Sequence, residues 1–371
     1  MTDDITESTF LAWIASAKMP ADYLRVLMLS RENAESVYRE IGSRNPDIAG
    51  MIPPDAMARL KDNSGTENLR RLSALISAHG IKAMTFRDPE FPHILLEIED
   101  PVSILFYQGN PACLSGRTVS MVGSRRASYG GLKAAQRIAR DLSREGVSVV
   151  SGFAYGIDSA SHRGCLEGGS PTAAVLGCGL DQNYPADNAG LREKVLDSGG
   201  VFLSEYAPGE KPLAGHFPYR NRIISAIGDA LVLMEAKIRS GSLRTVDHAL
   251  KQGKDIFVYP GEPDNPFFEG NHRLLRDGAR YFTTAEDILE DMNWLDKKPR
   301  DVQNSGCSDS PASASPAEDK IRKMLAAGEM SFEQIAAQAG LLPAELLSTL
   351  TIMQIRGIIE PVPGKKYRLK R

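Results

Sequence analysis

Residues 119–125 read Val-Ser-Met-Val-Gly-Ser-Arg, a mainly apolar run that ends in a glycine and a basic residue. A short run of this kind is typical of a strand that is buried on both faces. A glycine directly after such a strand lets the backbone turn tightly into a helix. The helical spacing of the apolar residues in 132–142 predicts that helix. The stretch therefore predicts one strand–turn–helix unit.

The same unit recurs between residues 81 and 295. The other candidate strands span 104–107, 147–150, 173–176, 201–203, 230–234 and 255–258. Helical patterns separate most of them, at 157–166, 191–196 and 243–250. Apolar strands separated by helices indicate a parallel sheet that is covered on both faces. We therefore predict an α/β fold, a Rossmann-like doubly wound parallel sheet.

The segments that flank this core have different patterns. Residues 1–80 predict a small helical N-terminal domain, with a loop or break at 45–66, which is rich in Pro, Gly, Asn and Asp. Residues 296–317 are rich in Ser, Pro and Ala and predict a flexible linker. Residues 318–371 predict three helices followed by a hairpin, the arrangement of a winged-helix domain.

Composition limits the classes of function. The chain has 371 residues, 42% hydrophobic and 25% charged, with a net charge of −3. Binding of a nucleic acid would therefore need a local basic patch. There is no apolar run long enough to span a bilayer and no secretory signal. The four cysteines form no CxxC pair, so the sequence indicates neither a zinc site nor a disulfide framework, and we expect a cytoplasmic protein.

Small, hydroxyl and basic residues follow the ends of several predicted strands, where open α/β sheets place their ligands. Backbone N–H groups at the start of the next helix bind anions, and arginines add positive charge. The alternative is a purely structural role, in which these are tight turns with arginines on the surface. The candidate residues in these turns are Gly123, Ser124, Arg125, Arg126, Ser151, Gly152, Ser240, Gly241 and Ser242. None of the turns matches GxGxxG or GxxxxGK[ST], so neither a dinucleotide cofactor nor P-loop chemistry is expected.

A further basic cluster opens a predicted buried helix at residues 217–224, Phe-Pro-Tyr-Arg-Asn-Arg-Ile-Ile. Its guanidinium groups would bind either phosphate or core carboxylates. Phe217, Arg220, Asn221 and Arg222 join the candidate DNA-binding residues. We expect Arg222 to be the more buried arginine, because it precedes the isoleucines, and Arg220 to be the freer DNA contact.

The chain contains no recognisable catalytic set. No Ser/His/Asp arrangement has the spacing of a nucleophile elbow, and no His/Glu cluster has the spacing of metal ligands. His162 has no visible nucleophile beside it, so a structural role is favoured over general-base catalysis. We therefore expect a binding protein without metal or cofactor, and no enzymatic activity.

The ordered motifs across residues 90–292 resemble the DprA (Smf) family of DNA-processing proteins of bacterial natural transformation. They include Val122–Arg125, Gly156–Asp158, Ala174–Asp181, Leu203–Tyr206, Phe217–Ile224 and Glu235–Leu243. The resemblance implies a recombination mediator, often a homodimer, that protects incoming single-stranded DNA and loads the RecA recombinase onto it. It places a phosphate-contacting arginine at Arg125. Double-stranded DNA is a possible additional partner.

The chain departs from the family pattern at two positions. Tyr155 stands where arginine is usual before Gly-Ile-Asp, which removes one cation. Arg244 stands where an aliphatic residue is usual, which would redistribute the positive charge. The N-terminal helices also lack the glycine-bearing hairpin of helix-hairpin-helix proteins, so no DNA binding is assigned to them.

Two other functions compete with this one. The core also looks like phosphoribohydrolases, whose catalytic glutamate would fall on His248, and a histidine is poorly suited to stabilising an oxocarbenium ion. Alternatively, the chain is a transcription regulator led by residues 318–371. That segment has nine basic and six acidic residues, most of the basic ones in a tail, so DNA binding and protein docking are both open.

Overall fold

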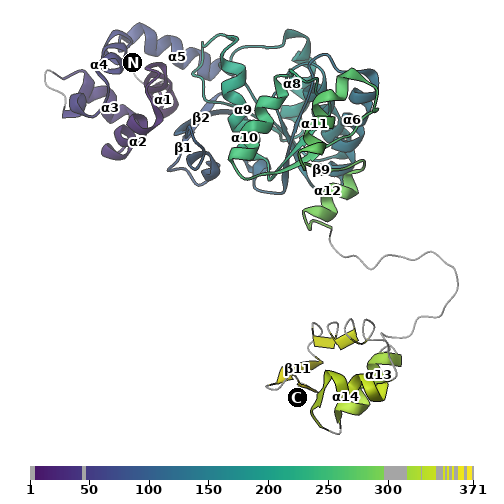
Figure 1. The fold of residues 1–371 in the computed structure, drawn as a ribbon. Helices are drawn as coiled ribbons and strands as arrows, with labels where there is room; N and C mark the ends of the chain where they lie inside the picture. The colour runs from purple at the N-terminus through teal and green to yellow at the C-terminus, as the bar shows by residue number, and fades with distance from the viewer. Residues whose placement is uncertain are drawn as a thin grey trace. The chain divides into compact units, whose positions relative to one another are not determined.

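The computed structural model describes residues 5–43, 47–295, 316–326, 328–339, 346, 349–350, 353–354, 358–362 and 366–369. The chain forms two compact units, Met1–Asp296 and Lys297–Arg371 (Figure 1). Among the described residues, no helix is long and apolar enough to cross a membrane.

A nine-stranded sheet in the order β1-β2-β6-β5-β4-β3-β7-β8-β9 forms the centre of the larger unit. All seven predicted strands are present, with one further strand at each edge. The strands are β1 (Lys82–Thr85), β2 (Ile104–Gly109), β3 (Thr118–Val122), β4 (Ser148–Ser151), β5 (Thr172–Val175), β6 (Val201–Ser204), β7 (Ala230–Leu233), β8 (Asp255–Val258) and β9 (Arg280–Tyr281).

The sheet is parallel from β6 to β9, but β2 is not part of the parallel array. It pairs antiparallel with both β1 and β6, with Phe106 opposite Ser204. The prediction that residues 104–107 belong to a parallel sheet is therefore wrong. Only the short 3-10 helix η2 (His93–Leu96) lies between β1 and β2. Antiparallel neighbours need no crossover helix, which accounts for the difference.

Helices cover both faces of the sheet, as a doubly wound fold requires. On one face, α9 and α10 lie side by side and bury Ile224 and Val246 against Leu231 and Leu233 (Figure 1). On the other face, α6, α7 and α12 pack on the alternate strand residues. The helices of this core are α6 (Tyr129–Arg144), α7 (Ile157–Gly168), α8 (Ala189–Asp197), α9 (His216–Ile227), α10 (Ser242–Lys251), α11 (Glu269–Arg276) and α12 (Ala285–Asp291).

The N-terminal segment is helical, as predicted. It forms α1 (Glu7–Ser16), α2 (Ala21–Ser30), α3 (Ala34–Ile41), α4 (Pro54–Asp62) and α5 (Thr66–Ala78). The prediction of a loop over 45–66 is wrong, because α4 lies there with Pro54 in its first turn, where a missing N–H costs no hydrogen bond. Buried residues of these helices share one apolar cluster with Phe106 and Phe202 of the sheet. Independent folding of residues 1–80 stays a prediction.

In the smaller unit, the described elements agree with the predicted winged helix, whereas most of the predicted third helix lies outside the described residues. The described elements are α13 (Pro316–Ala326), β10 (Met330–Ser331), α14 (Phe332–Ala339), β11 (Ile359–Val362) and β12 (Lys366–Leu369). The strands form an antiparallel sheet, β10-β12-β11, over a core that includes Ile321, Leu346 and Ile359. The predicted linker lies outside the described residues, except that α13 begins at Pro316.

The close approach of α6 and α7 depends on a glycine. A Cβ added at Gly164 would lie 2.1 Å from the carbonyl oxygen of Gln136 on α6. Because that oxygen belongs to the backbone, it cannot move aside without shifting the helix.

We predict that Gly164→Ala lowers the free energy of unfolding by about 1–3 kcal/mol, through overpacking that outweighs the better helix propensity of alanine. Gly190→Ala on α8 is the matched control, because an added Cβ there has no atom within 4 Å. That control should raise stability by up to about 1 kcal/mol. Urea unfolding of both variants tests this, and equal effects would contradict the packing argument.

His162 of α7 is a core residue. Its side chain is fully buried, and Nδ1 lies 2.8 Å from the hydroxyl of Thr172. Because that hydroxyl donates to the Val149 carbonyl, its oxygen accepts from Nδ1–H. Burial, with smaller contributions from Arg220 and Arg163, lowers the pKa of His162 to about 3. The geometry supports the structural role favoured from the sequence.

The depressed pKa of His162 predicts a pH dependence of stability. Between its folded value of about 3 and its unfolded value of about 6.5, only the unfolded state binds the proton. The free energy of unfolding therefore falls as the pH drops below 6.5, by about 2 kcal/mol at pH 5. Urea unfolding of wild type and His162→Gln near pH 7.5 and near pH 5 should show the gap between them shrinking by this amount. A gap independent of pH would refute the assignment.

Candidate nucleic-acid interface

The loops that follow β3, β4 and β7 meet where the order of the strands reverses, the position where open α/β sheets bind ligands. Backbone hydrogen bonds join them: the N–H of Ser124 donates to the Glu235 carbonyl at 2.8 Å, and that of Ile157 to the Ser124 carbonyl at 3.2 Å. Gly156 has a φ of +77°, and a Cβ there would lie 2.2 Å from the Ser124 oxygen. The three loops therefore form one rigid rim.

An open groove of about 820 Å³ runs along this rim, between the loops and the first turns of α9 and α10. Its lining contains the predicted residues Gly123, Ser124, Arg125, Arg126, Phe217, Arg220, Asn221, Ser240, Gly241 and Ser242. The structure thus brings together all of the predicted residues except Ser151, Gly152 and Arg222.

The exposed charge of the groove is positive. Arg125, Arg126, Lys237 and Arg239 are all exposed in its lining. Within the described part of the chain, none of the four has a carboxylate at ion-pair distance. The one carboxylate in the lining is that of Asp158, which is buried. Four cations without carboxylate partners in a concave site produce a field that attracts anions.

Lys237 and Arg239 were missed by the sequence analysis. Both lie between the end of β7 and the Ser240–Ser242 turn. The rule that ligand-binding residues follow the ends of strands predicts the turn and applies equally to these two residues. The sequence therefore contained the evidence for them. Arg244, the predicted site of redistributed charge, is exposed on α10 but does not line the groove. The two missed residues provide the positive charge on this side.

The start of α10 lies in the groove lining. The helix begins at Ser242, whose N–H donates to the Ser240 hydroxyl at 3.4 Å, and the N–H groups of Leu243 and Arg244 donate to the carbonyls of Ser240 and Gly241, each at 3.2 Å. The hydroxyls of Ser240 and Ser242 lie 2.7 Å apart. The positive end of the helix dipole therefore points into the groove together with two hydroxyl groups.

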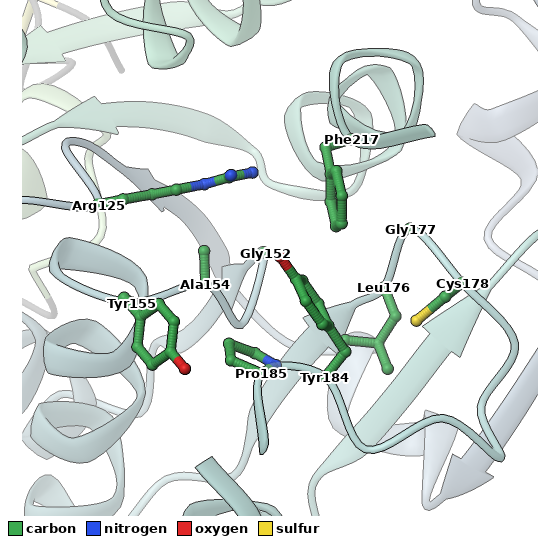
Figure 2. Close-up of a pocket in the computed structure, with 10 residues that line it drawn as sticks. All are labelled: Arg125, Gly152, Ala154, Tyr155, Leu176, Gly177, Cys178, Tyr184, Pro185 and Phe217. Atoms are coloured by element: carbon green, nitrogen blue, oxygen red, sulfur yellow. The ribbon is translucent and has the colours of Figure 1, made fainter. Parts of the chain in front are cut away.

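Aromatic rings extend the groove on the side of β4. The Phe217 ring lies under the Arg125 guanidinium at 5.0 Å and beside the Tyr184 ring at 5.4 Å. Tyr155 is 44% exposed, and its hydroxyl donates to Asp187 at 3.0 Å. These three aromatic residues and Arg125 surround a small pocket (Figure 2). An exposed ring thus stands at residue 155, where the resemblance implies an arginine.

Arg220 is not the free contact that the sequence predicted. Its side chain is 3% exposed, and its guanidinium donates to the carbonyls of Gly152, at 2.9 Å, and Val175. Burial lowers its pKa to about 10, an effect that nearby Asp158 opposes, so the group remains charged. Burial raises the pKa of Asp158, and Arg220 opposes that shift. The expectation fails because α9 directs Arg220 inward, onto the strand ends.

Arg222 is buried, at 4% exposure, but the prediction that it is the more buried of the two arginines is wrong, because Arg220 is 3% exposed. Both of its terminal nitrogens donate to the Glu205 carboxylate, at 2.8 and 2.7 Å, and its Nε donates to the Asp100 carbonyl. It does not line the groove. The prediction that Arg222 contacts DNA is therefore wrong. Of the two predicted roles, binding phosphate or pairing with a core carboxylate, Arg222 has the second.

Ser151 and Gly152 also have structural positions. Ser151 is fully buried, and its hydroxyl donates to the Met121 carbonyl at 2.7 Å. Gly152 is buried, and a Cβ there would lie 2.7 Å from both Arg220 and Asp158. The strand-end pattern predicts where both residues lie along the sheet, but it does not predict whether a residue faces the rim or the core.

Other polar residues near the rim hold the scaffold. The buried carboxylate of Glu235 accepts from the N–H of Ser128, at the start of α6. The side chain of Asn271 donates to the carbonyls of Met234 and Tyr259 and so ties the ends of β7 and β8 together. His248 lines a different cavity. In the described chain, no cluster of three or more potential metal ligands occurs.

Comparison with known proteins gives consistent results across the chain. The family model for DNA recombination-mediator protein A matches residues 82–293, and that for the DprA winged helix domain matches residues 308–365. The DNA processing protein DprA of Streptococcus pneumoniae is 41% identical over 207 residues, which cover 56% of this chain and 73% of the relative. Protein Smf of Escherichia coli is 35% identical over 289 residues, 76% of each chain.

Solved structures show the same relationship. The crystal structure of DprA from Streptococcus pneumoniae has a TM-score of 0.63 and 32% identity, and the match covers 76% of this chain and 97% of that one. DprA from Helicobacter pylori, whose structure is described as revealing a single-stranded DNA binding mode, has a TM-score of 0.52 and 27% identity, with 57% and 95% covered. The chain therefore belongs to the DNA recombination-mediator protein A family, together with the DprA and Smf proteins.

Proposed function

We propose that this chain binds single-stranded DNA in the groove at the carboxyl ends of β3 and β7. The observation that carries the proposal is the set of four exposed cations without carboxylate partners, Arg125, Arg126, Lys237 and Arg239. A phosphodiester backbone supplies the negative charges that these groups lack. The described binding mode of the Helicobacter pylori relative supports the same ligand.

The aromatic rings favour a single strand over a duplex. Tyr155, Tyr184 and Phe217 lie beside the cations, and the first two are 44% and 39% exposed. Unpaired bases can stack on such rings, whereas the bases of a duplex are already stacked on one another. Stacking tolerates any base, so we expect little sequence preference.

We further propose that the protein acts by binding and not by catalysis. The one carboxylate in the groove lining is buried Asp158, beside Arg220. His248, at the position of the hydrolase glutamate, lines another cavity, with Arg222 and Lys251. A carboxylate poised over a sugar ring, which glycoside cleavage needs, is thus absent from the described groove.

Membership of this family supports a more specific role in natural transformation. We propose that the bound strand is protected during natural transformation and is passed to RecA, in the cytoplasm, by a homodimer of this chain. The groove binds the DNA backbone, and the recombinase recognises the base sequence. The winged-helix unit is proposed to add affinity for DNA, double-stranded DNA included, or to dock a protein.

We predict that the double variant Arg125→Ala/Lys237→Ala loses at least about tenfold in affinity for oligodeoxythymidine at moderate salt. The slope of log affinity against log salt should become shallower by about 1.4, because each lost phosphate contact on a single strand contributes about 0.7. Fluorescence anisotropy over a range of salt concentrations measures both quantities.

The matched control for this test is Lys194→Ala/Arg276→Ala. Both residues are exposed, lie outside the groove lining and have no ion-pair partner in the described chain. The control changes the net charge equally and should leave affinity within about twofold. Unchanged binding in the groove variant, or equal loss in both, would sink the assigned site.

The mediator role predicts that wild-type protein shortens the lag before RecA filaments form on DNA covered by single-strand-binding protein. The Arg125→Ala/Lys237→Ala variant should lose this effect, because it cannot hold the strand, whereas the Lys194→Ala/Arg276→Ala control should retain it. Fluorescence of labelled DNA reports the filament. An unchanged lag with wild-type protein that binds DNA normally would count against RecA loading while leaving DNA binding intact.

A further inference from the structure

A second cavity lies on the other side of α9 from the groove. This cleft has a volume of about 640 Å³ and is bounded by the end of α1, the start of α2, residues 99–104 and the loop after β6. On α9, His216, Tyr219 and Arg222 line the cleft, whereas Phe217 and Asn221 line the groove. One helix therefore separates two cavities, and the cleft has no part in the function proposed above.

The lining of the cleft is acidic. It contains the carboxylates of Asp22, Glu99, Asp100, Glu205 and Glu210, against the cations of Lys18 and Arg222. Three of the carboxylates have cationic partners: Glu205 pairs with Arg222, Glu210 with Lys18 and Glu99 with Lys251. The remaining two, Asp22 and Asp100, are exposed and form no hydrogen bond or ion pair through their carboxylates within the described chain. Asp100 is nevertheless near enough to help Glu205 raise the pKa of Arg222, which burial lowers. The cleft thus carries the opposite charge to the groove.

A buried hydroxyl in the cleft lining has no partner. Ser103 is 2% exposed, and no hydrogen-bond partner is present for its Oγ in the described structure. Leaving such a group unpaired costs about 1–3 kcal/mol. Most buried hydroxyls of folded proteins are paired, so an orphaned one in the wall of the cleft marks a place where a ligand could supply the missing partner once the enclosed Oγ is uncovered.

Flat rings complete the lining. Tyr206 and His216 are stacked with their ring centroids 4.1 Å apart and an interplanar angle of 15°. Tyr219 is 43% exposed, and the Arg222 guanidinium lies 3.8 Å from its ring centroid. This wall already stacks one planar cation, and a guanidinium gains from both ring faces and carboxylates.

We propose that the cleft binds a basic, arginine-bearing segment of a partner protein. The Asp22 and Asp100 carboxylates would pair with the guanidinium groups, the rings would stack on them, and the Ser103 hydroxyl would accept a hydrogen bond. The charge of the cleft excludes nucleic acid, so this site and the DNA groove select different classes of partner.

The test uses the full chain and a fluorescein-labelled peptide of alternating glycine and arginine. Binding followed by fluorescence polarisation should weaken about tenfold in Asp22→Asn/Asp100→Asn. The matched control is Glu145→Gln/Asp197→Asn, two exposed acids outside the cleft without described partners, and it should change affinity less than about twofold. A peptide with glutamate in place of arginine should not bind.

Hydrogen exchange of the wild-type complex gives a second measurement that needs no variant. The arginine peptide should slow exchange in residues 99–104 and leave residues 123–128 of the groove unchanged. Affinity for single-stranded DNA should be the same in wild type and in the Asp22→Asn/Asp100→Asn variant. Failure of peptide binding in the cleft can therefore be distinguished from failure of DNA binding in the groove. The proposal is overturned by no binding of the arginine peptide, by equal weakening in the two variants, or by protection outside the cleft.

Discussion

The guanidinium of Arg220 lies at the carboxyl ends of β4 and β5 and donates to the carbonyls of Gly152 and Val175. These carbonyls lie at the ends of their strands, where unpaired backbone oxygens would otherwise be buried at a cost. The same contact fixes the rotation of α9 on the sheet. Two residues later, on the opposite side of the same turn, the Arg222–Glu205 pair anchors the helix. With α9 fixed in this way, Phe217 and Asn221 face the groove and Tyr219 faces the cleft.

This arrangement separates the arginines that hold the fold from the basic residues that are available to a ligand. Of the buried pair, Arg220 donates to two backbone carbonyls and Arg222 pairs with Glu205, whereas Arg125, Arg126, Lys237 and Arg239 project from strand-end loops into an open groove. A chain with a net charge of −3 can therefore attract a polyanion, because the field depends on the local distribution of charge. The acidic cleft on the opposite side of α9 shows the same local organisation with reversed sign.

The sequence was sufficient to predict the strands of the core, because buried strands are short and apolar and glycines mark their ends. It was also sufficient to place most groove residues on one rim, since parallel strands share their carboxyl edge. It was insufficient to predict the direction of β2 relative to its neighbours, because a buried strand has the same apolar pattern in a parallel and in an antiparallel pairing. It was also insufficient to predict that the side chains of Arg220 and Ser151 face the core. The direction of a side chain at a strand end or helix start depends on tertiary packing, which a local sequence pattern does not contain. Lys237 and Arg239 follow the same strand end as the Ser240–Ser242 turn, so the rule that predicts the turn predicts them as well.

We propose that the exposed rim of the groove, and not the buried arginine pair, meets the DNA. The most direct measurement is photocrosslinking of an oligodeoxythymidine with 4-thiothymidine at single positions, followed by mass spectrometry of the crosslinked peptides. Short-range crosslinks should fall on the aromatic and basic residues of the groove, Tyr155, Tyr184, Phe217 and the loops around Arg125 and Lys237. Crosslinks confined to the winged-helix unit or to the N-terminal helices, with none in these segments, would contradict the account.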